Sequence, residues 1–561
     1  MGTFQHPSSK PYLVLFCIFA VAQIFFTSGI SYGWSSIAVV FRMEKYFFEL
    51  CGNDTNHNAS STGPQDEIPG CEAQDHILNL IVTLTWFTSM FMQFPAGVLV
   101  DRWGPRFGQI LGLCFYIPAG IWFTMTTPKY PYSLFGIFIM ISIGSSWLVL
   151  SAYKVVNVVY KGARSRIMCI LSGTYDSSAV FMLIFKVAYD HHISLKYVLV
   201  TYTALCGIIV ATGAIFLIPS LRRLRYWMSS LHSDGNALES STGENLVAST
   251  KSYGAIDATN VPAVQVVNDD NDDDDDNEST TLLKSNPSNV KDNMPASYDA
   301  HASKSAIWAS VSSPLYLLEI AFLAAIQLKL WFFVGTLSDR LIDMSHNDKH
   351  VVNKYIYIFG LIQFSGLAIT TLCGMIFDRN RIFNIETKYL SAEEFRLQRM
   401  QESITPFLIT LVLSILMSVG TMLRNMSVQI PLFILYTLVR GFLYSSYGAY
   451  IGSVFPENQF GTLFGLGIFI AGCFGLLEYF LFWLTTDVFH DNPFWPDTIL
   501  LILIVLAAIH PLYLYLHCKK EDNKILTNAL EQSGQHKKGE NMENYCLDIM
   551  KSIIRGWCQP S

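Results

Sequence analysis

The residues of this chain that could do chemistry are charged side chains inside long apolar runs. Asp176 lies in Tyr175-Asp176-Ser177-Ser178, Arg440 lies one helical turn before Tyr444, and Glu478 lies in a third run. Ionisable groups in such surroundings are costly, so each is a candidate functional residue. A carboxylate accepts the N–H groups of a planar ligand, and a buried guanidinium must pair with a carboxylate or a ligand. The pattern therefore predicts recognition of a small polar molecule.

Internal pairing is the alternative for each charged group. Asp176 could be tied to Lys186 or Lys154, which lie on the same or a neighbouring helix. Arg440 is predicted to pair within the protein, as a structural residue. Glu319 lies near the end of its run and is predicted to be structural, whereas Glu478 lies deeper.

Neutral polar and aromatic residues at similar depth complete the candidate binding set. Amides could bond the edge of a heterocycle, and aromatic rings could stack on a flat ligand. Each of these side chains could equally make a helix-to-helix hydrogen bond or belong to the core. They are Ser177, Tyr175, Gln327, Gln363, Trp34, Asn157 and Tyr444.

Enzymatic chemistry has almost no support in the sequence. It contains no Walker loop, no cluster with metal-ligand spacing and no nucleophile with a base nearby. No basic footprint for nucleic acid is present either. We therefore expect a protein that is not an enzyme and has no catalytic residues, no cofactor, no metal and no nucleic-acid partner. A monomer is expected to be sufficient, in contact with a lipid bilayer and a small-molecule substrate.

The elements that must position these residues are membrane helices. The chain has 561 residues, of which 51% are hydrophobic and only 14% are charged. Segments long enough to cross about 30 Å of hydrocarbon predict an all-α membrane protein. The twelve predicted segments are 12–36, 77–100, 107–127, 132–157, 166–189, 196–218, 313–336, 352–377, 405–423, 430–454, 462–486 and 497–517.

The connections predict the orientation. One side carries most of the Lys and Arg, as in Arg222-Arg223-Leu224-Arg225, so both termini are predicted to be cytoplasmic. The loop 43–76 then faces outside, and it carries sequons at Asn53 and Asn58. Cys51 and Cys71 in this loop are predicted to form a disulfide, although two free thiols are the alternative.

The domain boundaries follow from composition. We expect a cytoplasmic N-terminus at 1–11, a six-helix half at 12–218, a second half at 306–517 and a cytoplasmic tail at 518–561. The link 219–305 is rich in Ser, Asn and Asp and carries the acidic run Asp269 to Glu278. Because such a segment buries too little apolar area to offset its entropy, it is predicted to be disordered.

A sequence motif occurs once in each of the two predicted halves. Gly97-Val98-Leu99-Val100-Asp101-Arg102-Trp103-Gly104-Pro105-Arg106 recurs in degraded form as Gly374-Met375-Ile376-Phe377-Asp378-Arg379. Each copy ends the second apolar segment of its half, which is typical of a transporter built from two repeats. The glycine permits close helix contact, and the Asp can pair with Arg or with the positive N-terminus of a helix in the other half. Such contacts would close one gate.

This loop resembles that of the major facilitator superfamily. The resemblance implies the major facilitator fold, with twelve transmembrane helices in two pseudo-symmetric halves that rock around a central site. The residues that it assigns to gating or structure are Gly97, Asp101, Arg102, Arg106, Gly374, Asp378 and Arg379.

Further segments resemble solute carrier family 43, over nearly all twelve helices. They are Gly33-Trp34-Ser35, Leu50-Cys51-Gly52, Gly70-Cys71-Glu72-Ala73-Gln74-Asp75, Tyr175-Asp176-Ser177-Ser178-Ala179-Val180, Ile193-Ser194-Leu195, Phe455-Pro456-Glu457-Asn458-Gln459-Phe460-Gly461 and Asn492-Pro493-Phe494-Trp495. One branch of that family comprises sodium-independent transporters of large neutral amino acids such as leucine, isoleucine, phenylalanine and methionine. The other contains an equilibrative transporter of adenine, guanine and hypoxanthine.

The triplet Asp176-Ser177-Ser178, Ile326-Gln327-Leu328 and Leu50-Cys51-Gly52 resemble the nucleobase branch. Val439-Arg440-Gly441-Phe442 and Trp103-Gly104-Pro105-Arg106 resemble the amino acid branch, and Lys154 and Glu478 depart from both. The resemblance therefore implies a plasma-membrane carrier of purine nucleobases. A carrier of large neutral amino acids is the first alternative, and a non-transporting membrane scaffold or receptor is the second.

Overall fold

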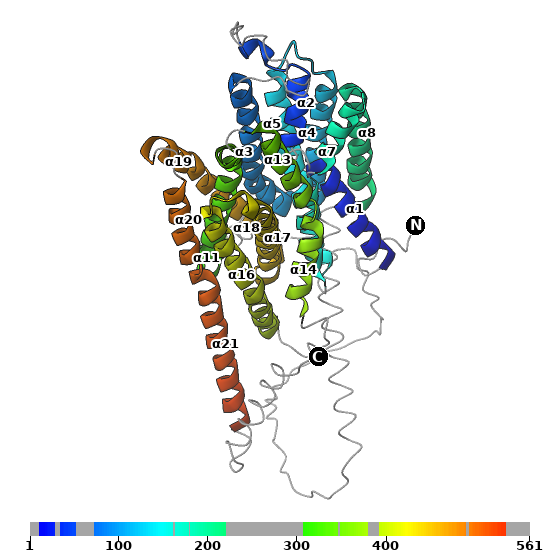
Figure 1. The fold of residues 1–561 in the computed structure, drawn as a ribbon. Coiled ribbons are helices and arrows are strands. Elements are labelled where there is room, and N and C mark those ends of the chain that lie inside the picture. Colours follow the sequence, from blue (N-terminus) through cyan, green and yellow to red (C-terminus); the bar gives the residue numbers. More distant parts are fainter. Residues whose placement is uncertain are drawn as a thin grey trace, which may run out of the picture. The chain divides into compact units, whose positions relative to one another are not determined.

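The structure is a computed structural model. It describes residues 10–28, 34–51, 72–160, 163–178, 180–219, 307–345, 348–379, 392–489 and 493–534. All regular elements within these ranges are helices, which confirms the predicted all-α class (Figure 1). The predicted link from residue 220 to 305, the sequons at Asn53 and Asn58, and Cys71 lie outside the described residues.

The N-terminal half contains eight α-helices. They are α1 (Lys10–Ser28), α2 (Trp34–Met43), α3 (Glu72–Trp103), α4 (Pro105–Met125), α5 (Ser133–Val159), α6 (Arg164–Ser177), α7 (Val180–Asp190) and α8 (Leu195–Thr212). The short η2 (Phe48–Cys51) carries Cys51, and the π-helix η3 (Gly213–Leu217) extends α8.

The C-terminal half is also helical. Its α-helices are α11 (Pro314–Gly335), α12 (Leu337–Met344), α13 (Lys349–Gln363), α14 (Gly366–Phe377), α16 (Ala392–Met422), α17 (Gln429–Val454), α18 (Phe460–Gly475), α19 (Leu477–Trp483), α20 (Phe494–Ala507) and α21 (Ile509–Gly534). The short helices η4 (Met426–Val428) and η5 (Glu457–Gln459) precede α17 and α18, and the π-helix η6 (Leu484–Val488) follows α19.

Ten helical segments of the described residues are long and apolar enough to cross a membrane. The predicted spans 12–36 and 166–189 are not among them, so the count of twelve is not reached. The region of the predicted span 12–36 contains two separate helices, α1 and α2. The region of the predicted span 166–189 likewise contains two, because α6 ends before α7 begins. The ten remaining predictions each coincide with a helix or a pair of consecutive helices.

Two helices extend well past their predicted ends. α16 starts at Ala392 rather than near 405, because its polar first turns are held by ion pairs of Arg399 with Asp378 and Glu402. α21 continues to Gly534, about five turns beyond the predicted end of the last span (Figure 1). The predicted tail therefore begins as helix. Hydropathy detects only the apolar part of such helices.

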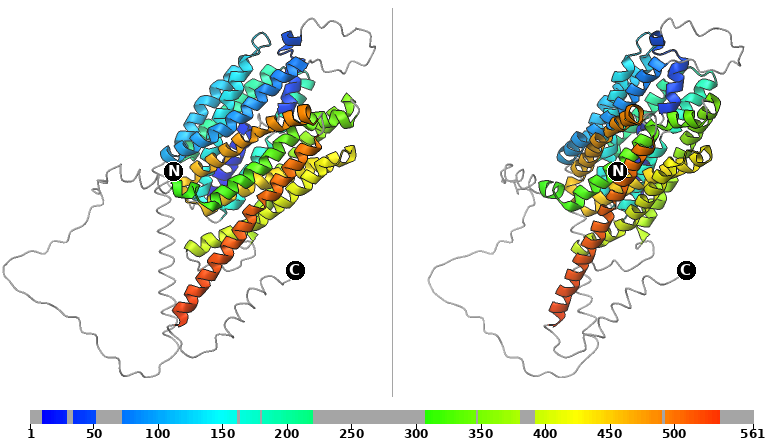
Figure 2. Two further views of the ribbon diagram at one scale, coloured as in Figure 1. Left: turned by 90° about the vertical axis from the view of Figure 1, so that its left-hand side faces the viewer. Right: turned by 60° about the vertical axis from the view of Figure 1, so that its left-hand side comes forward.

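The described helices of both halves belong to one compact unit. α3 packs along α18, and α6 packs along both α14 and α17, so each pairing joins one half to the other (Figure 2). The N-terminal half has its own aromatic core, which includes Phe41, Phe123 and Phe138. A second apolar cluster contains Cys169 from α6 together with Cys373 and Phe442 from the C-terminal half. The interface between the halves is therefore packed like a core along part of its length.

Candidate functional site

An ion pair between the two halves lies at the centre of the candidate site. Asp176, in the last turn of α6, forms an ion pair with Arg440 of α17, with Oδ1 and Nη2 2.8 Å apart. Both side chains are buried. Arg440 therefore pairs within the protein, as predicted, but its partner is neither a gating residue nor a residue of its own half. A buried pair of this kind needs good geometry to offset the loss of water around both charges.

Two tyrosines flank Arg440 on the same face of α17, because residues four apart on a helix share a face. Tyr436 hydrogen-bonds Arg440. Tyr444 donates to Oε1 of Gln327 on α11 at 3.2 Å. The Gln327 amide in turn donates to the sulfur of Met90 on α3, at 3.2 Å. The amide thus makes a second polar link between the halves.

Glu478 of α19 lies near this cluster. Its carboxylate faces Gly335 of α11, where a side chain would collide with it, and its charge acts on Tyr436. Within the part of the chain that the structure describes, Glu478 has neither an ion-pair nor a hydrogen-bond partner. The cluster therefore combines one guanidinium with two carboxylates, and only Asp176 is neutralised.

Ser177 binds the backbone of the opposite half. Its hydroxyl donates to the carbonyl of Phe364 at 3.1 Å and accepts from the N–H of Leu367 at 2.9 Å. Both backbone groups lie at the break between α13 and α14, where the regular helix hydrogen bonds are interrupted. Gln363 is the last residue of α13, beside the same break. Tyr175 is partly exposed and lies within electrostatic reach of Tyr444.

Two of the predicted binding residues lie elsewhere. Trp34 packs edge-on against Phe138 in the aromatic core of the N-terminal half, with ring centroids 5.1 Å apart. Asn157 is fully buried beside Gly452, and its amide has no hydrogen-bond partner among the described residues. A polar or aromatic residue type within an apolar run does not reveal which helix face it occupies, which is why these two positions could not be separated from the others.

The first copy of the repeated motif joins the halves at one end of the bundle. Asp101 accepts the backbone N–H groups of Gly461 at 3.1 Å and Thr462 at 2.6 Å, and also the Thr462 hydroxyl at 2.8 Å. These N–H groups belong to the first turn of α18, where the helix dipole favours an anion. Lys154 pairs with Asp101 at 2.5 Å and donates to the carbonyl of Glu457 at 2.6 Å. Lys154 is therefore the partner of Asp101, not of Asp176.

Gly97 lies one turn before Asp101 and directly against the backbone of Gly461, so a Cβ on Gly97 would overlap that backbone. The expected close approach of two helices is thus present at this glycine. Close to this contact, Arg164 donates to the carbonyl of Gly452 and forms an ion pair with Glu457. We call this end of the bundle the closed end.

The second copy of the motif also lies at an interface between the halves. Asp378 is fully buried between Arg166 of α6, at 3.0 Å, and Arg399 of α16, at 2.9 Å. Gly374 lies against the backbone of Arg166. The basic partners at these two contacts come from distant helices, and they are Lys154, Arg164, Arg166 and Arg399.

Among the described residues, the arginines within the motif copies make no contact between the halves. Arg106 donates to the carbonyl of Ile215 in its own half at 3.4 Å, Arg379 donates to Ile376 of its own helix at 3.4 Å, and Arg102 is exposed. Their predicted part in gating rested on the motif alone, and the spacing within a motif cannot identify partners on other helices.

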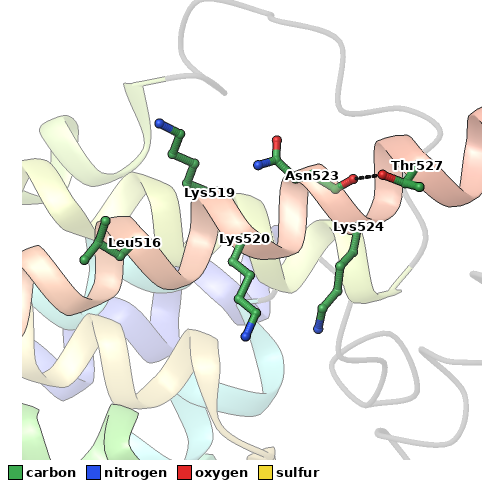
Figure 3. A pocket seen from close by; sticks show the side chains of 6 residues that line it. All are labelled: Leu516, Lys519, Lys520, Asn523, Lys524 and Thr527. Atoms are coloured by element: carbon green, nitrogen blue, oxygen red, sulfur yellow. Dashed lines mark hydrogen bonds between the residues drawn. The ribbon is translucent and has the colours of Figure 1, made fainter.

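A groove of about 510 Å³ lies on α21, away from the central cluster. Lys519, Lys520 and Lys524 line it with Leu516, Asn523 and Thr527 (Figure 3). These lysines are exposed on the helical extension beyond the predicted last span. The groove belongs to that extension and not to the site between the halves.

The family model of the Major Facilitator Superfamily matches residues 71–477 of this chain. This chain belongs to the major facilitator superfamily. In fold it is similar to the proton:xylose symporter XylE, with a TM-score of 0.54 at 10% identity, covering 89% of this chain and 95% of the other. The predicted fold family is therefore confirmed, and the chain is a multi-pass membrane transporter rather than an enzyme.

Two curated relatives match almost the whole chain. Equilibrative nucleobase transporter 1 of Bos taurus is 24% identical over 515 residues, which cover 92% of this chain and 98% of the relative. Large neutral amino acids transporter small subunit 3 of Mus musculus is 24% identical over 553 residues, which cover 91% of this chain and 95% of the relative. The predicted resemblance to solute carrier family 43 is thus confirmed, and identity favours neither branch.

Proposed function

We propose that this superfamily member carries purine nucleobases, namely adenine, guanine and hypoxanthine, down their gradients across the plasma membrane. Transport needs no sodium and proceeds by alternating access. The observation that carries the proposal is the cluster of Asp176, Arg440, Gln327 and Tyr444, because it places hydrogen-bonding groups from both halves at one point.

The chemistry of the cluster suits the edges of purines. An amide pairs with the N6 and N7 groups of adenine, and a guanidinium pairs with the O6 and N7 acceptors of guanine. Hypoxanthine carries the same O6 and N7 acceptors. Gln327 supplies the amide, Arg440 supplies the guanidinium, and the neighbouring tyrosines offer ring faces for stacking. One site can thus accept all three bases.

The closed end is predicted to face the cytoplasm. It contains the connections that the positive-inside rule assigns to the cytoplasm, with both termini on the same side. Opening this end requires the contacts of Asp101 and Asp378 to separate. The orientation is tested by enzymatic deglycosylation, which should lower the mass of the chain through Asn53 and Asn58.

A large neutral amino acid is the second candidate substrate, and the Asp176–Arg440 pair favours it. The carboxylate of a zwitterion could replace Asp176 at Arg440 while its ammonium binds Asp176. Such an exchange of partners would preserve the charge balance of the site.

Uptake of labelled adenine and labelled leucine separates the two candidates. Cells that express the chain are compared with cells that lack it, with and without sodium. The nucleobase proposal expects saturable adenine uptake that sodium does not alter and that excess guanine inhibits. Saturable leucine uptake without adenine uptake would overturn it.

A further inference from the structure

Two cysteine thiols meet across the interface between the halves. Cys169 lies on α6 and Cys373 lies on α14, both are free, and both have 0% exposed surface. The two side chains belong to one buried apolar cluster. Their sulfurs also face consecutive residues of α17, since Cys169 approaches the carbonyl of Ser445 and Cys373 approaches the hydroxyl of Ser446, each at 3.8 Å.

The helices that carry the two thiols pack unusually closely at this level. A Cβ on Gly374, the residue after Cys373, would lie 3.2 Å from the Cβ of Cys169 and 3.0 Å from the Cα of Arg166. A disulfide requires Cα atoms within about 7 Å and Cβ atoms about 4 Å apart. The glycine next to Cys373 therefore brings α14 close to α6 at the level of Cys169, and both cysteines lie in the same buried cluster.

We propose that Cys169 and Cys373 form a redox-sensitive pair, and that a disulfide between them holds the closed end of the transporter shut. The two residues belong to opposite halves and lie between the central ion pair and the Asp378 contacts of the closed end. Opening that end must separate α6 from α14. A covalent bond between them prevents the separation and stops transport.

The oxidation is a two-electron step with a peroxide as oxidant. When the closed end opens, water reaches the thiols, and one thiolate attacks hydrogen peroxide to give a sulfenic acid and hydroxide. When the end closes again, the second thiol attacks the sulfenic sulfur, forming the S–S bond and releasing water. Overall, two thiols and one peroxide give one disulfide and two waters. A reducing thiol reverses the step by disulfide exchange.

The first readout is the bond itself, and it does not depend on any substrate. A protease cleavage sequence is inserted into the full chain near residue 260, between the halves. After peroxide treatment and cleavage, the halves should stay joined on a non-reducing gel and separate after dithiothreitol. Mass spectrometry should find the peptide of Cys169 linked to that of Cys373. Separated halves after peroxide would overturn the proposal.

The second readout is uptake. Peroxide should inhibit the parent chain in proportion to the joined fraction, and dithiothreitol should restore uptake. Cys169→Ser and Cys373→Ser should each resist inhibition, whereas Cys114→Ser, a change at an exposed cysteine of α4, should remain sensitive. Joined halves with undiminished uptake, or equal inhibition of the Cys373→Ser chain, would contradict the proposal. Joined halves in a chain that carries neither nucleobases nor amino acids would count against the proposed function alone.

Discussion

Replacing Asp176 by asparagine removes the negative partner of Arg440 while almost preserving the shape of the side chain. The guanidinium then stays buried without a counter-charge, as both groups are buried and 2.8 Å apart. Breaking a buried pair in this way costs about 3–5 kcal/mol in the free energy of unfolding. We expect the lower part of this range, because the asparagine oxygen still accepts one hydrogen bond from Arg440.

A double variant separates binding from stability. Asp176→Asn combined with Arg440→Gln removes both charges, and replacing a buried pair by neutral groups is often close to neutral for stability. We therefore expect the double variant to recover most of the lost stability. Its uptake should stay abolished, because the groups that contact the solute are gone.

Asp497→Asn is the matched control. Asp497 is as deeply buried as Asp176 and pairs with Lys329 and Arg340, each at 2.8 Å, but these three residues lie within the C-terminal half and outside the central cluster. This variant should also lose stability, yet keep the uptake of each molecule that reaches the surface.

The assays are surface biotinylation, thermal unfolding of the purified chain in detergent, and adenine uptake normalised to surface protein. Asp176→Asn should lose uptake per surface molecule. Normal uptake per surface molecule in the double variant would refute the reasoning, since the pair would then be purely structural.

Three further predictions concern the gate and the amide. Asp101→Asn weakens charge-assisted bonds worth about 1.5–3 kcal/mol and leaves Lys154 without a carboxylate partner. Labelling of a cysteine introduced at the closed end should therefore become faster, and an unchanged labelling rate would contradict this. Gly97→Val should prevent the contact with Gly461 and lower uptake more than it lowers surface expression, whereas loss of both in equal measure would indicate a folding defect. Gln327→Leu should raise the adenine KM about tenfold and leave leucine uptake, if any, unchanged, because it removes one bidentate contact worth about 1–3 kcal/mol; an unaltered adenine KM would exclude Gln327 from the site.

The helical class and the contacts of the repeated motif were predictable because their signals are local. An apolar run of sufficient length must be helical in a bilayer, and the Gly-x-x-x-Asp spacing places a close contact and a carboxylate one turn apart. Asp101 of α3 binds the N-terminus of α18, which is the kind of contact that the motif predicts.

The partners across the bundle were not predictable from local signals. Lys154 is 53 residues from Asp101, and Arg166 is 212 residues from Asp378, so only the packing of separate helices brings them together. Asp176 illustrates the same point. Arg440 was predicted to pair with a buried carboxylate or a ligand, but the sequence does not single out Asp176, and both lysines considered for Asp176 lie in its own half. Trp34 was a candidate binding residue but lies in the aromatic core of the N-terminal half, because an aromatic residue suits a core and a binding site equally well.

Ser177 couples two events that would otherwise be independent. The residue that follows the central carboxylate is also the residue that fills the gap between α13 and α14 in the opposite half. Under the proposed function, a solute bound at Asp176 would also displace the Ser177 hydroxyl that supports this break. Solute binding and bending between α13 and α14 would then be linked through a single side chain.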